Sequence, residues 1–72
     1  MQLVINGQQK DFPSLEANST ISQLLAHLGL KGDRVAIEHN GEIVPRSNWE
    51  SVSLHSGDKL EIVHFVGGGL QP

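Results

Sequence analysis

Residues 20–29, Thr-Ile-Ser-Gln-Leu-Leu-Ala-His-Leu-Gly, decide the fold of this 72-residue chain, because they specify its clearest helix. Four aliphatic residues recur at spacings of three and four, which places them on one helical face: Ile21, Leu24, Leu25 and Leu28. Thr20 stands at the N-cap position, and Gln23 completes a capping box. Gly29 follows the last apolar residue, where glycine commonly ends a helix. We therefore predict a helix over residues 21–28.

The segment before this helix predicts a β-hairpin. Residues 2–6, Gln-Leu-Val-Ile-Asn, have the aliphatic and β-branched composition of a strand. Asn6-Gly7 is the dipeptide favoured by a type I′ turn, whose two central residues need positive φ. Residues 8–13 then return as a second strand that ends at Phe12-Pro13.

The segment after the helix predicts three more strands, over residues 35–39, 42–45 and 59–66. Asn40-Gly41 repeats the turn signal between the first two, and Pro45 ends the second. Residues 46–55 have no clear period, so we expect a loop with a short helical turn around Trp49.

This order of elements predicts an α+β domain in which one helix covers one face of a four- to five-stranded mixed sheet. Parallel pairing of the first and last strands would place the last strand in the centre. That is the β-grasp arrangement, as in ubiquitin. We assign residues 1–66 to this single domain and expect residues 67–72 to form a flexible C-terminal tail.

Composition excludes several classes of function. The chain has eight acidic and five basic residues, a formal charge of −3, and no run of Lys or Arg, which argues against nucleic acid or an anionic membrane as a partner. It has no cysteine, so thiol chemistry on the chain itself is excluded. The N-terminal residues lack the apolar run of a signal peptide, and we expect a cytoplasmic protein.

Four motifs occur in one order along nearly the whole chain. Their residues are Met1–Gly7, Thr20–Leu25, Ile43–Trp49 and Gly57–Ile62, and a glycine run follows them. The third, Ile-Val-Pro-Arg-Ser-Asn-Trp, is the most specific of the four. In this order the motifs resemble the ThiS family, the ubiquitin-like sulfur carriers of thiamin biosynthesis.

The resemblance implies a function for the tail. In such carriers a ThiF-like adenylyltransferase uses ATP to adenylate the terminal glycine carboxylate, which matches Gly69 here. Sulfur then replaces AMP to give a thiocarboxylate, and a ThiG-like thiazole synthase takes that sulfur into the thiazole ring. The carrier is then a co-substrate, not an enzyme, and binds no cofactor itself. Gly67 and Gly68 would let the tail thread a narrow channel, because glycine has no side chain.

Leu70-Gln71-Pro72 depart from the family pattern, because such carriers typically end at the glycine pair. As written, Gly69 is in a peptide bond and has no free carboxylate. We expect a processing protease to remove the three residues. An inactive form or an artificial addition are the alternatives.

The last strand also predicts a docking surface. Leu60, Ile62 and His64 alternate with Glu61, Val63 and Phe65, so both faces carry apolar residues. Either loop residues of the chain bury Val63 and Phe65, or these side chains form an exposed patch that docks on partner enzymes. We take Val63, Phe65, Val44 and Arg46 as candidates for partner docking.

Other sites find little support in the sequence. The four histidines (His27, His39, His55 and His64) lack metal-ligand spacing, so we expect no metal site. Trp49 is expected to anchor a loop on the core. Alternative functions remain: a sulfur carrier for molybdopterin or cysteine synthesis, a ubiquitin-like protein modifier, or an interaction module whose glycines have no chemical role.

Overall fold

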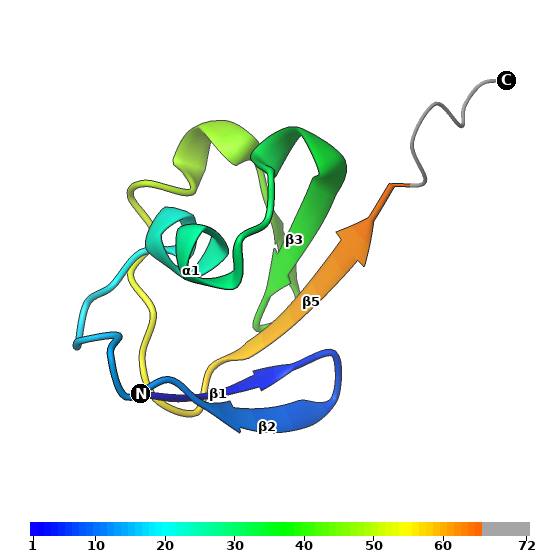
Figure 1. The fold of residues 1–72 in the computed structure, drawn as a ribbon. Coiled ribbons are helices and arrows are strands. Elements are labelled where there is room, and N and C mark those ends of the chain that lie inside the picture. Colours follow the sequence, from blue (N-terminus) through cyan, green and yellow to red (C-terminus); the bar gives the residue numbers. More distant parts are fainter. Residues whose placement is uncertain (66–72) are drawn as a thin grey trace, which may run out of the picture.

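The computed structural model describes residues 1–65. Figure 1 shows a curved sheet with a short helix packed on one face. The strands are β1 (Gln2–Ile5), β2 (Gln8–Asp11), β3 (Val35–His39), β4 (Glu42–Val44) and β5 (Lys59–His64). The helical elements are α1 (Ile21–Leu28) and two short 3₁₀ helices, η1 (Gly32–Arg34) and η2 (Arg46–Asn48).

The sheet has the strand order β2-β1-β5-β3-β4, so β5 is central. β1 and β5 pair in parallel, with Val4 opposite Lys59, whereas the other neighbouring strands pair antiparallel. The predicted mixed sheet with a central last strand is therefore confirmed. One helix covers one face, which makes the fold a two-layer β-grasp domain.

Helix α1 has the predicted bounds and the predicted caps. The Thr20 hydroxyl accepts a hydrogen bond from the Gln23 backbone N–H at 3.2 Å, and the Gln23 side chain accepts one from the Thr20 N–H at 2.8 Å. Gly29 ends the helix with φ of 73°, a left-handed conformation that glycine adopts without strain. Ile21 and Leu24 are fully buried against the sheet.

The core is mostly aliphatic, and its fully buried side chains are Leu3, Ile21, Leu24, Ile37, Leu54 and Leu60. Trp49 closes the end of the core nearest η1 and η2, as predicted for a loop anchor. Its indole Nε1–H donates to the Val44 carbonyl at 2.9 Å, and its side chain is buried. A Cβ on Gly32 would lie only 3.0 Å from Trp49 Cζ3, so the absence of a side chain at Gly32 makes room for the indole.

The strands are shorter than predicted at their ends. β1 ends at Ile5, because Asn6 has φ of 51° and leaves the extended region. β2 ends at Asp11, two residues early, and β4 ends at Val44. The predicted last residue of β5, Val66, lies outside the described residues. Between residues 1 and 65, no helix has the length and apolarity needed to span a membrane.

Candidate functional site

The carboxyl end of β5 is the base of the predicted reactive tail. Phe65 is the last described residue, and its N–H donates to the Arg34 carbonyl at 2.8 Å, so the chain is held beside η1 where it leaves the sheet. The residues predicted to carry or thread the reactive carboxylate, Gly67, Gly68 and Gly69, lie outside the described residues. So does the extension Leu70-Gln71-Pro72.

The sheet face opposite α1 carries an apolar patch next to this exit. We call this face of the sheet the open face. Val63 and Phe65 are each 56% exposed, so loop residues do not bury them. Ile43, which sequence reasoning missed as a docking residue, is 77% exposed and lies on the same face. Ile43 and Val63 line a shallow hollow of about 200 Å³ on this face.

Two carboxylates lie side by side among these apolar residues. Glu38 of β3 and Glu61 of β5 are register partners in an antiparallel pair, and both line the shallow hollow. Like charges directly opposite one another destabilise a sheet. Neither carboxylate belongs to an ion pair in the described part of the chain, so the open face combines apolar surface with unneutralised negative charge.

The other two predicted docking residues lie elsewhere. Val44 is the register partner of buried Ile37, so its side chain is on the helix-covered face, half-buried against the core. Arg46 is exposed in η2 and lies near Gly32. A Cβ added at Gly32 would be 3.8 Å from the Arg46 Nε. The predicted docking set is thus divided between two surfaces.

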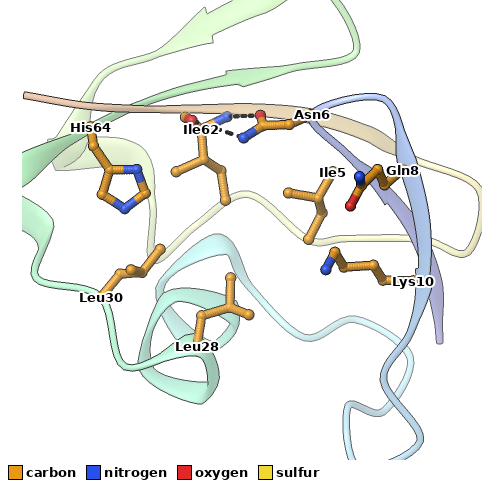
Figure 2. Close-up of a pocket in the computed structure, with 8 residues that line it drawn as sticks. All are labelled: Ile5, Asn6, Gln8, Lys10, Leu28, Leu30, Ile62 and His64. Carbon is orange, nitrogen blue, oxygen red and sulfur yellow. Dashed lines mark hydrogen bonds between the residues drawn. The ribbon is translucent and has the colours of Figure 1, made fainter.

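A second hollow lies on the helix-covered side, between the end of α1 and the strands β1, β2 and β5. Figure 2 shows four aliphatic side chains gathered around it, and its volume is about 310 Å³. These side chains are Ile5, Leu28, Leu30 and Ile62. Asn6, Gln8, Lys10 and His64 supply its polar lining, and none of these is acidic.

A polar cluster links the β3–β4 turn to the start of β5. His39 Nε2 lies 2.8 Å from Asp58 Oδ2, and Asn40 Nδ2 donates to Asp58 Oδ1 at 3.3 Å. The His55 backbone N–H also donates to Asp58, at 2.9 Å. Burial alone would raise the pKa of the Asp58 carboxyl, but these hydrogen bonds outweigh it and hold that pKa below its ordinary value of 3.8.

The hydrogen bonds of this cluster indicate a structural role, because they hold the β3–β4 turn against the start of β5. Hydrogen-bond donors surround the Asp58 carboxylate. Within residues 1–65, the His39 ring makes no hydrogen bond to a hydroxyl or thiol that could act as a nucleophile. The same residues contain no group of three or more His, Cys, Asp or Glu side chains able to hold a metal ion.

Comparison with known proteins adds to this geometry. A model of the ThiS family matches residues 3–69. The sulfur carrier protein ThiS of Bacillus subtilis is 42% identical over 67 residues, covering 93% of this chain and 98% of that protein. A crystal structure of the thiamine biosynthesis protein ThiS from Geobacter metallireducens superposes with a TM-score of 0.80 at 30% identity, covering 96% of this chain and 100% of that chain.

Longer proteins also contain a region similar to this chain. A thiazole synthase of Paramagnetospirillum magneticum is 49% identical over 69 residues, which cover 96% of this chain and 20% of that protein. A thiazole synthase of Magnetococcus marinus is 38% identical over 72 residues, 100% of this chain and 21% of that protein. The chain therefore spans about a fifth of the length of these two relatives.

Proposed function

The chain belongs to the ThiS family, and from that premise we propose that it carries sulfur on the carboxylate of Gly69 for formation of the thiazole ring of thiamin. One observation carries the proposal. The family match begins in β1 and ends at Gly69, the glycine immediately before Leu70. The similarity therefore includes the glycine run as well as the folded domain.

The proposed chemistry needs an activating partner. A carboxylate is a poor electrophile, because its negative charge repels nucleophiles. A ThiF-like adenylyltransferase uses ATP to convert the Gly69 carboxylate to an acyl adenylate, with release of pyrophosphate. The outer sulfur of a persulfide then displaces AMP and forms an acyl disulfide with the carrier. A thiol cleaves the S–S bond of that acyl disulfide, which releases the thiocarboxylate and leaves a disulfide on the donor, and the thiocarboxylate delivers its sulfur to a ThiG-like thiazole synthase. The chain acts as a co-substrate in both steps.

The three residues after Gly69 must leave before this chemistry begins. While Leu70 is attached, Gly69 is in an amide bond and has no oxygen that can attack ATP as a carboxylate. We therefore include cleavage between Gly69 and Leu70 by a processing protease in the proposed function.

The open face is the proposed docking surface for the activating enzyme. Two of its exposed apolar side chains, Val63 and Phe65, lie where the tail leaves the sheet, and the third, Ile43, lies on β4, two strands away. Glu38 and Glu61 add negative charge that a basic partner surface would neutralise. The partner that fits combines apolar side chains with Lys or Arg.

Intact-mass spectrometry on two versions tests the proposal. The full chain and a version ending at Gly69 are each incubated with ATP, a sulfur source and a ThiF-like enzyme. We expect only the version ending at Gly69 to gain the mass that corresponds to exchange of one oxygen for sulfur. If neither version changes while the enzyme modifies a control carrier, the sulfur-carrier assignment fails.

A further inference from the structure

We propose that the hollow on the helix-covered side is a second docking surface, which binds the thiazole synthase through an aliphatic side chain beside a carboxylate. We call it the helix-side hollow. The inference rests on the proposed function and adds to it, because it assigns the two enzymes to opposite sides of the sheet.

The lining of the helix-side hollow determines the kind of group it can hold. Ile5 and Ile62 form an apolar floor, and the half-buried side chains of Leu28 and Leu30 form a wall. Figure 2 shows these four side chains converging from the strands and from the end of α1. An aliphatic side chain of a partner would bury apolar area against these four side chains.

The rim of the hollow favours a carboxylate. Lys10 is exposed on β2, and Figure 2 shows its amino group on the hollow's side of the strand. The His64 ring lies over Leu30 at the other end, and none of the described residues that line the hollow is acidic. On a chain with a formal charge of −3, the Lys10 ammonium on this rim contrasts with Glu38 and Glu61 on the open face. The two surfaces therefore select partners of opposite charge.

Both surfaces border the exit of the tail. His64 lines the helix-side hollow, and Phe65, the next residue, belongs to the open face. An enzyme seated on either surface thus holds the last residues of β5, from which the tail extends toward its active site. An enzyme can bind at one surface without displacing an enzyme from the other.

Relatives that join the two functions in one chain favour this division. In the two thiazole synthases that include a region similar to this chain, tethering gives the synthase an effective concentration of about millimolar at the carrier region. A tethered synthase on the open face would compete with the activating enzyme at every encounter. A contact made through one aliphatic side chain in the helix-side hollow is weak, which is sufficient at such a concentration, and it leaves the open face to the untethered enzyme.

Separate assays of the two steps test the assignment. Lys10→Glu reverses the rim charge, and Lys31→Glu makes the same change of net charge at an exposed residue that does not line the hollow. Versions ending at Gly69 are used for activation, and chemically prepared thiocarboxylates are used for sulfur delivery. We expect Lys10→Glu to slow sulfur delivery at subsaturating synthase by about tenfold, with less salt dependence than the parent chain, and to leave activation unchanged. Lys31→Glu should change neither step.

Methyl NMR of the full chain gives a second readout that needs no sulfur chemistry. Titration with thiazole synthase should shift the methyl signals of Ile5, Leu28, Leu30 and Ile62, and leave those of Ile43 and Val63 in place. Shifts confined to the open face, or equal slowing of both steps by Lys10→Glu, would overturn the inference. If the prepared thiocarboxylate of the parent chain delivers sulfur but activation never occurs, the proposed activation fails while the hollow assignment stands.

Discussion

The side-chain amide of Asn6 pairs with the backbone of Ile62 as a strand residue would. Asn6 Oδ1 accepts from the Ile62 N–H at 2.7 Å, and Asn6 Nδ2 donates to the Ile62 carbonyl at 3.2 Å (Figure 2). The amide thereby extends the parallel contact between β1 and β5 beyond the point where the backbone of β1 turns away. The β-hairpin and the central strand are joined through this side chain.

Replacing Asn6 by glycine should destabilise the fold by about 1–2 kcal/mol, because two hydrogen bonds to β5 are lost while the positive φ stays accessible. Asn18→Gly is the matched control, since Asn18 has φ of 70° and no recorded side-chain hydrogen bond within residues 1–65. Urea unfolding measures both variants. Equal stability of the two would show that the amide contributes nothing beyond its turn conformation.

Gly32→Ala should destabilise the chain by about 1–3 kcal/mol, because the new methyl group meets the Trp49 ring at 3.0 Å. Trp49→Phe removes Cζ3 and the bond to Val44, and so relieves part of that clash. The double variant should therefore lose less stability than the sum of the single variants. Additive losses in thermal or urea unfolding would contradict the contact between these residues.

Acid unfolding should depend on Asp58. Its folded-state pKa lies below 3.8, so its stabilising contribution is complete above that pH and is lost as the pH falls toward the folded-state value. Asp58→Asn should lower the free energy of unfolding at neutral pH and make its decline below about pH 4 shallower. Asp33→Asn, at an exposed position, provides the control. The prediction fails if both variants keep the slope of the parent chain.

Glu61→Gln should make the free chain more stable by about 0.2–1 kcal/mol, because it removes repulsion from Glu38 across the strand pair. The same change should slow thiocarboxylate formation by the activating enzyme, because the open face loses charge that a basic partner would neutralise. Glu50→Gln, at an exposed position outside the sheet, should do neither. Faster or unchanged activation of Glu61→Gln would argue against docking on this face.

Ile43 and Val44 should give opposite results although they are neighbours. Ile43→Ser changes a side chain that is 77% exposed, so the free energy of unfolding should change by no more than about 0.5 kcal/mol while activation slows. Val44→Ser changes a side chain packed on the core, so stability should fall while the folded fraction is still activated normally. Unfolding curves and initial activation rates, measured on the same samples, separate the two effects.

Local signals were sufficient to predict much of the fold. The spacing of Ile21, Leu24 and Leu25, together with the capping box, specifies α1 to its terminal residues. Asn6-Gly7 and Asn40-Gly41 form turns because both members of each dipeptide adopt positive φ, as predicted from their residue types. These features depend on residues a few positions apart, which a sequence pattern displays directly.

The other features of the fold and of the site could not be predicted, because they depend on pairing between residues far apart in the sequence. The sequence pattern groups Val44 with Val63 and Phe65, but the face of Val44 is set by the register that places it opposite Ile37. A three-residue strand carries too short an alternation to reveal that face, so Ile43 was overlooked for the same reason. Local sequence likewise does not predict two long-range hydrogen bonds. One joins Asn6 to Ile62, and in the other the Lys59 N–H donates to the Asn40 side chain at 2.8 Å.

The central position of β5 also has a consequence for folding during synthesis. β5 is made last among the strands, yet β1 and β3 contact each other only through it. Before residues 59–64 leave the ribosome, the nascent chain has two separate hairpins and a helix with no continuous sheet to cover. The slow step is then closure of a loop of more than fifty residues between Val4 and Lys59. A chain interrupted before that step presents neither docking surface, so incomplete copies would not occupy the enzymes that the finished protein must visit.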